Sequence, residues 1–237
     1  MLSAPAGFGK TTVVSQWINE QYQRQQHPPV AWIALDPGDN GPVRFWRYVM
    51  MACQVFQNDG GSCALTLLGS VPRSPLASSS LEQLLRTFLN ELASLPHRSI
   101  LILEDYHVIT SPEIHASLVF VLEHLPVMLH LIVITRVDPP FPLPRLRARG
   151  ELCELRTDDL RFSEEDTASF LQHFLPIELS CEDIRHLDCR LEGWVTGLRL
   201  MSLALQRRVW LLLRFFKGSP AVSTLRKTHP PWRGLKQ

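Results

Sequence analysis

The sequence predicts an α/β protein in which helices cover both faces of a mainly parallel sheet, followed by a small all-α segment. Short aliphatic runs alternate with segments whose apolar residues recur at helical spacing, which is the order of parallel strands joined by helical crossovers. From Ser163 onward only helical patterns follow. We therefore expect a first domain at residues 1–160, a helical segment at 161–206 and a basic tail at 207–237.

Length and composition exclude several classes of protein. The chain has 237 residues, 45% hydrophobic and 20% charged, which is typical of folded globular proteins and not of disordered or collagen-like chains. A formal charge of +1 gives no general reason to expect nucleic acid or an anionic membrane as partner. Five cysteines without a C-x-x-C pair argue against a disulfide framework and a zinc site. No signal peptide or membrane-spanning run is visible, so we expect a cytoplasmic protein.

Residues 4–11 follow the pattern G-x-x-x-x-G-K-[ST], with Ala4 in place of the first glycine. In such a loop backbone N–H groups point at phosphate oxygens, and the helix that follows adds its positive end. Lys10 would reach the β and γ phosphates and Thr11 would bind Mg²⁺, so ATP or ADP with Mg²⁺ is the expected ligand. The alternative is a glycine-rich turn that only opens a helix. The predicted nucleotide-binding residues of the loop are Ala6, Gly7, Phe8, Gly9, Lys10, Thr11 and Thr12.

The next elements also alternate between helix and strand. His27-Pro28-Pro29 breaks a polar stretch, and the apolar residues 30–35 after it predict a strand. Residues 43–55 have an apolar face at helical spacing. The stretch 58–80, rich in Gly, Ser and Pro, is the most linker-like part of the chain.

A helical pattern at 81–95 leads into the aliphatic run 99–103, which Glu104 and Asp105 follow directly. Such a run is typical of a parallel strand buried on both faces. The carboxyl ends of parallel strands form the edge where ligands of open α/β sheets bind. We therefore expect both carboxylates to serve the metal ion and an attacking water, with Thr11 as a further metal ligand. A solvated turn is the alternative.

Ser111 and Pro112 predict the start of another helix, and residues 129–135 predict a buried strand that ends at Arg136. A guanidinium at this edge can pair bidentately with phosphate oxygens. We expect Arg136 to be the third catalytic residue, beside the two acids. A surface salt bridge is the alternative.

The helical segment has capping-box patterns at Ser163 and Ser180. Segments of this kind often cover a nucleotide at the edge of the preceding sheet. Gly193 and Trp194 are therefore candidate nucleotide contacts, with helix packing as an equally open explanation.

Six motifs resemble, in order, the nucleotide-binding module of the large ATP-binding LuxR-type transcriptional regulators. The resemblance extends to about residue 206 and implies a STAND/AAA-type P-loop ATPase, whose small helical segment is winged-helix-like. In that family ADP holds a closed monomer, while ATP and an inducer favour an oligomer that activates transcription. The resemblance gives Arg136 the role of sensing the γ-phosphate. The motifs occupy residues 3–12, 36–48, 103–107, 135–140, 145–152 and 192–198.

The chain also departs from the family pattern. Glu104 stands where the family more often has aspartate, and the additional methylene is expected to weaken hydrolysis more than binding. The strand before the loop, central in the sheet, is reduced to residues 2–3. No helix-turn-helix fits into the chain, so no direct DNA binding is expected. No acid follows Glu192, and the resemblance ends in the same region, which suggests a truncated or frameshifted fragment.

Together these observations predict an ATP/ADP-binding switch module of a LuxR-type regulator, with slow ATP hydrolysis at most. Its expected partners are nucleotide and either the remainder of a regulator or a second copy, without a membrane. Two alternatives stay open. One is a kinase-like P-loop phosphotransferase with Arg145, Arg147 and Arg149 as a basic lid, and the other is a non-functional relic.

Overall fold

The computed structural model describes residues 1–24, 28–56, 64, 66, 78–175 and 181–215. The chain divides into two compact units, Met1–Leu160 and Arg161–Gln237. Most of the predicted linker-like stretch, Ser180 with its expected capping box, and residues 216–237 lie outside the described ranges. The apolar clusters of the described residues do not cross this boundary.

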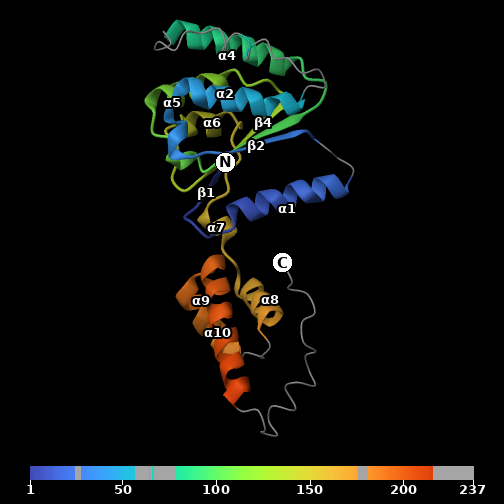
Figure 1. Ribbon diagram of the computed structural model, residues 1–237, viewed down its shortest axis with the longest axis vertical. Helices are drawn as coiled ribbons and strands as arrows, with labels where there is room; N and C mark the ends of the chain where they lie inside the picture. Colours follow the sequence, from blue (N-terminus) through green and yellow to red (C-terminus); the bar gives the residue numbers. More distant parts are fainter. Residues whose placement is uncertain (25–27, 57–63, 65, 67–77, 176–180, 216–237) are drawn as a thin grey trace. The chain divides into compact units, whose positions relative to one another are not determined.

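The first unit contains a sheet of four strands in the order β1-β4-β3-β2, and every neighbouring pair is parallel (Figure 1). This confirms the predicted α/β class and its parallel sheet. The three longer strands begin where the aliphatic runs predicted and end within one residue of the expected positions. The strands are β1 (Leu2–Ser3), β2 (Val30–Ala34), β3 (Ser99–Glu104) and β4 (Leu129–Thr135).

Strand β1 is as short as expected. It stands at one end of the order of the named strands, but it has parallel partners on both sides. A single parallel bridge joins Leu2 to Leu155 beyond it. The Ser3 amide donates to the Leu155 carbonyl (2.9 Å), and the Leu155 amide donates to the Met1 carbonyl (2.9 Å). The outer edge of β1 is therefore covered by the segment that leads out of the first unit.

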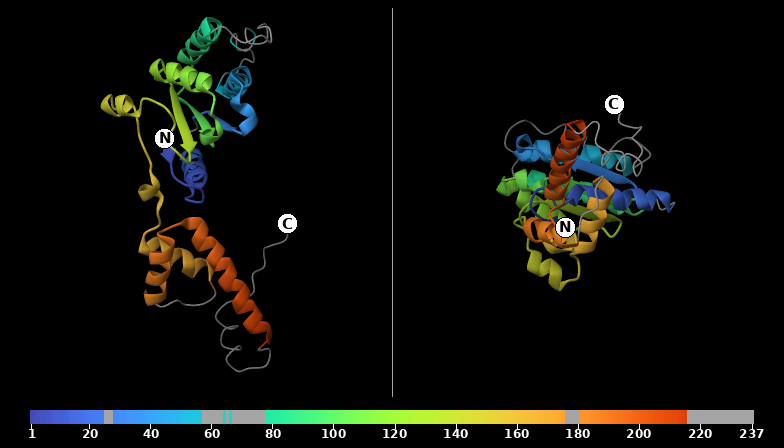
Figure 2. Two further views of the ribbon diagram at one scale, coloured as in Figure 1. Left: turned by 90° about the vertical axis from the view of Figure 1, so that its left-hand side faces the viewer. Right: turned by 90° about the horizontal axis from the view of Figure 1, so that it is seen from below.

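Helices cover both faces of the sheet (Figures 1 and 2). Helix α1 (Lys10–Gln23) lies on one face, while α2 (Pro42–Cys53), α4 (Ser78–Ala93) and α5 (Pro112–Glu123) lie on the other. Because side chains of a strand alternate between faces, β3 sends Leu101 and Leu103 to the larger core and Ile100 and Ile102 to the core under α1. Ser111 caps α5 as predicted, accepting from the Ile114 amide.

The loop after β2 fixes the loop after β3. Asn40 ends the short helix η1 (Pro37–Asn40). Its side-chain oxygen accepts from the amides of Thr110 (2.6 Å) and Ser111 (3.1 Å), and its side-chain nitrogen donates to the Val108 carbonyl (2.9 Å). These bonds satisfy backbone groups that no strand or helix serves, so the chain that follows β3 is held in place.

The described part of the second unit is helical. Ser163 and Asp166 form the predicted capping box at the start of α8 (Glu164–Phe174). Helices α9 (Cys181–Leu191) and α10 (Val195–Phe215) pack with it around a small apolar core, and α10 continues across residue 206 without a break. Within the described ranges, no helix is both long and apolar enough to cross a membrane.

Candidate functional site

The loop between β1 and α1 has the backbone of a phosphate-binding turn. Gly7 and Gly9 have φ angles of 84° and 76°, in the left-handed region that side chains disfavour and glycine tolerates. Gly9 is the N-cap of α1, and within this described helix no side chain caps the N-terminus and no acid lies in the first turn. The helix therefore directs N–H groups and a partial positive charge toward the space in front of the loop, which favours binding of an anion there.

Lys10 is folded back onto this loop. Its Nζ donates to the carbonyls of Ala4 (2.7 Å) and Pro5 (2.9 Å), and the residue is 8% exposed. Burial lowers the pKa of Lys10, and the positive charge of Arg136 lowers it further. An anion in the loop would compensate both effects, because it would stabilise the ammonium form.

Glu104 lies directly against the start of α1. The Thr11 hydroxyl donates to Glu104 Oε1 (2.5 Å), and the Trp32 indole Nε1 donates to Oε2 (2.8 Å). Ile100 and Ile102 belong to the core under α1, and Glu104, two positions further along β3, points to the same face. The alternation of the strand thus brings a carboxylate to the predicted metal-binding hydroxyl.

Asp105 has different partners from its neighbour. It follows the last residue of β3 directly and has a left-handed backbone, with a φ of 54°. Asp105 Oδ1 lies 3.9 Å from Arg136 Nε and 3.6 Å from His107 Nδ1. Burial lowers the pKa of His107, and the charge of Arg136 lowers it further. Among the described residues, nothing hydrogen-bonds to the buried Nδ1 of His107.

The structure therefore brings five of the predicted residues to one edge of the sheet: Lys10, Thr11, Glu104, Asp105 and Arg136. Phe8 is half-buried in the loop, while Ala6 and Thr12 are exposed beside it. That these residues bind nucleotide stays a prediction.

Gly193 and Trp194 belong to the second unit, and their contact with a nucleotide also stays a prediction. Gly193 has a φ of 68°, and a Cβ there would lie 2.5 Å from the Phe162 carbonyl oxygen and 2.8 Å from its nitrogen. The Phe162 amide donates to the Gly193 carbonyl (3.1 Å). Close packing by itself thus requires glycine at this position.

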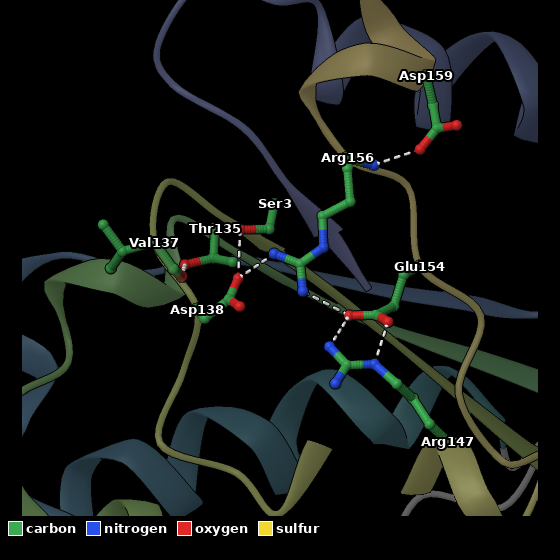
Figure 3. Close-up of polar contacts among 8 residues, drawn as sticks. All are labelled: Ser3, Thr135, Val137, Asp138, Arg147, Glu154, Arg156 and Asp159. Atoms are coloured by element: carbon green, nitrogen blue, oxygen red, sulfur yellow. Dashed lines mark hydrogen bonds and ion pairs between the residues drawn. The ribbon is translucent and has the colours of Figure 1, made fainter. Parts of the chain in front are cut away.

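A polar network beside the site was not predicted (Figure 3). Asp138 Oδ1 accepts from the Ser3 hydroxyl (2.9 Å) and from Arg156 Nη1 (2.5 Å). Arg156 Nη2 also binds Glu154 (2.6 Å), and Arg147 pairs with the same carboxylate through two nitrogens (2.6 and 2.9 Å). The hydrogen bonds from Arg147 and then Arg156 lower the pKa of Glu154 to about 2.

The sequence contained weak signals for the residues of this network and for the contact between Trp32 and Glu104. Asp138 and Arg147 lie in motifs at 135–140 and 145–152, but spacing alone gives them no partner. Trp32 stands out as an indole within an aliphatic strand. Its donor can be assigned to Glu104 only when β2 is known to lie beside β3.

The three arginines that would form a basic lid under the phosphotransferase alternative are all paired in the structure. Arg145 Nη1 lies 2.6 Å from Glu123 Oε1, Arg147 binds Glu154 as above, and Arg149 Nη1 lies 3.9 Å from Glu151 Oε2. These arginine side chains are about half exposed, and exposed ion pairs contribute little to stability, so the pairs leave the phosphotransferase alternative open.

Comparison with known proteins gives a consistent set of relatives. The chain is 34% identical over 204 residues to the HTH-type transcriptional regulator MalT of Cronobacter sakazakii, covering 86% of the chain and 21% of that protein. It is 32% identical over 208 residues to MalT of Vibrio campbellii (88% and 22%) and 33% identical over 204 residues to MalT of Yersinia enterocolitica (86% and 21%). No protein-family model matches the chain.

These matches confirm the predicted resemblance to a large transcriptional regulator. The chain spans about a fifth of the length of the curated relatives it matches.

Proposed function

We propose that this chain is an ATP/ADP-binding switch module of a MalT-like transcriptional regulator that acts in the cytoplasm, with slow ATP hydrolysis at most. The observation that carries the proposal is the direct bond between Thr11 and Glu104. It joins the start of a helix opened by a glycine-rich loop to the acid at the end of a buried parallel strand, 93 residues later in the chain.

The residues fit a nucleotide with Mg²⁺. The N–H groups at the start of α1 and the Lys10 ammonium would hold the phosphates. The Thr11 hydroxyl and the Glu104 carboxylate offer oxygen ligands of the kind that Mg²⁺ prefers. When bound, Mg²⁺ neutralises phosphate charge. Lys10 would exchange the Ala4 and Pro5 carbonyls for phosphate oxygens.

A switch needs a group that contacts ATP and ADP differently. Arg136 meets this requirement because its side chain is half exposed and only loosely paired with Asp105, at 3.9 Å. The γ-phosphate would offer it a stronger partner than that carboxylate. Asp105 would then orient the attacking water, and Glu104, longer than the usual aspartate, would keep hydrolysis slow. Response to an inducer, self-association and DNA binding would need the rest of a regulator.

Thermal unfolding with and without Mg-ATP or Mg-ADP tests the proposal. Nucleotide at about 100 times its Kd stabilises a protein by about 2.7 kcal/mol, which predicts a rise in Tm of about 5 to 10 °C for a chain of this size. Lys10→Ala should abolish the rise. Arg24→Ala is the matched control at the far end of α1, where the charge forms only an exposed pair with Glu20, and it should keep the rise. A wild-type melt that neither nucleotide moves would exclude the function.

A further inference from the structure

The carboxylate of Glu104 is held at both oxygens by donors from two different elements. Thr11, in the first turn of α1, binds Oε1, and Trp32, in the middle of β2, binds Oε2 at 2.8 Å. The phosphate-loop motif explains the first donor. Neither that motif nor the strand motif of residues 103–107 includes the second.

The register of the sheet explains why Trp32 reaches Glu104. Trp32 pairs with Ile102, and Ala34 pairs with Glu104. The Trp32 ring packs against the core under α1, on the face to which Glu104 points. An indole has one N–H donor and no acceptor, so it can fix the carboxylate without competing for a cation. Its packed ring makes that donor a fixed point.

A glutamate at this position needs a second, rigidly held hydrogen-bond donor more than an aspartate does. Its additional methylene adds a rotatable bond, and ordering that bond costs conformational entropy. With Oε2 bonded to Trp32, Oε1 remains directed at Thr11, where the proposed metal ion would sit. Without the indole N–H, only the Thr11 hydroxyl would orient the side chain.

Resting on the proposed nucleotide site, we propose that Trp32 is a positioning residue that holds Glu104 in its metal-binding orientation and so sets the Mg²⁺ requirement of nucleotide binding. Trp32 acts through Glu104 and touches neither nucleotide nor metal. Binding of Mg²⁺-free nucleotide depends on the loop amides and Lys10, so it is independent of Trp32.

The test is a Mg²⁺ titration of ADP binding, followed with a fluorescent ADP analogue. Trp32→Phe retains an aromatic ring and removes the N–H. We expect it to raise the Mg²⁺ concentration for half-maximal binding by roughly tenfold, as for loss of a hydrogen bond to a charged group. Affinity for the analogue in EDTA should change by less than about twofold. Trp17→Phe, a 41% exposed tryptophan of α1, is the matched control and should titrate like wild type.

A double-mutant cycle separates positioning from a general loss of structure. In a Glu104→Gln background, Trp32→Phe should change the Mg²⁺ midpoint by less than about twofold, because the two residues act as one unit. The indole N–H resonance of Trp32 is assigned in the ¹⁵N–¹H spectrum of the nucleotide-free protein as the one that Trp32→Phe removes. Its chemical shift should change in Glu104→Gln and should not change in the control Glu20→Gln.

The outcomes distinguish failure of the proposed role of Trp32 from failure of the proposed nucleotide site. Superimposable Mg²⁺ titrations of Trp32→Phe and Trp17→Phe, with normal binding by both, would overturn the role of Trp32 and leave the nucleotide site intact. An equal loss in EDTA and in Mg²⁺ would also overturn it, since a damaged fold weakens both. If wild type binds no nucleotide under any condition, the proposed function and the role of Trp32 fall together, although the indole resonance would still report the hydrogen bond.

Discussion

The Arg136 guanidinium lies 3.9 Å from the Asp105 carboxylate, measured from Nε to Oδ1. The two residues follow neighbouring parallel strands, so the pair spans the edge of the sheet beside the loop. Both side chains are about half exposed, at 50% and 43%, and exposed pairs of this kind contribute little to stability. The pair can therefore exchange partners at a small energetic cost.

Replacing Arg136 with glutamine should remove discrimination between nucleotides and leave binding itself intact. We expect affinity for a non-hydrolysable ATP analogue to fall by about tenfold, because a charge-assisted contact to the γ-phosphate is lost. Affinity for ADP should change by less than about twofold. Isothermal titration of both ligands measures the ratio, with Arg149→Gln as the control. Equal losses for both nucleotides would show that Arg136 does not distinguish them.

Breaking the Asp138–Arg156 pair should loosen the segment that covers β1. Arg156→Gln removes the bonds to Asp138 and Glu154, and we expect the free energy of unfolding to fall by about 1 kcal/mol, since the groups are partly exposed. Urea unfolding measures the change. Arg24→Gln, whose ion pair with Glu20 spans 4.0 Å, should have no measurable effect, and equal effects of both variants would contradict a special role for the network.

Glu154 should make stability depend on acid pH. Its pKa is about 2 in the folded chain against an ordinary 4.5, so its stabilising contribution is complete above pH 4.5 and is lost as the pH falls toward 2. Glu154→Gln should therefore destabilise the protein at pH 7, and this difference from wild type should shrink between pH 4.5 and 2. Unfolding by urea across this range tests the trend. A difference that does not change with pH would show that Arg147 and Arg156 do not depress the pKa.

Substitution of Gly193 tests whether close packing against Phe162 stabilises the second unit. Gly193→Ala should lower the free energy of unfolding by about 2 kcal/mol or more, because alanine disfavours this φ and its Cβ would also clash with the backbone of Phe162. Gly150→Ala is the matched control, since Gly150 has the same φ of 68° but nothing within 4 Å of an added Cβ. Gly150→Ala should lower the free energy of unfolding by about 1 kcal/mol. Chemical unfolding followed by circular dichroism measures both. A variant at Gly193 that unfolds like the Gly150 control would remove the packing explanation.

Much of the fold could be predicted from local patterns. The aliphatic runs located β2, β3 and β4 because strands buried on both faces contain few polar residues. Ser111 and Ser163 marked helix starts because their hydroxyls satisfy amides that the first turn leaves unpaired. The two residues of β1 carry no information on which strands they join, so its expected central place depended on the family resemblance alone.

The sequence by itself determined the chemistry available to this protein. It supplied a glycine-rich loop ending in Lys10 and Thr11, the acids Glu104 and Asp105 after a strand, and Arg136 after the next. Each of those assignments depends on residue types and their spacing within one short segment, and both can be read from the sequence.

Only the tertiary structure decided which of these groups meet. Strand alternation and the left-handed backbone at Asp105 send one acid to Thr11 and the other to Arg136. The parallel register of β2 and β3 brings the indole of Trp32 to Glu104, 72 residues away. Contacts of this kind depend on strand order and packing, which arise from interactions over the whole domain and have no local signal in the chain.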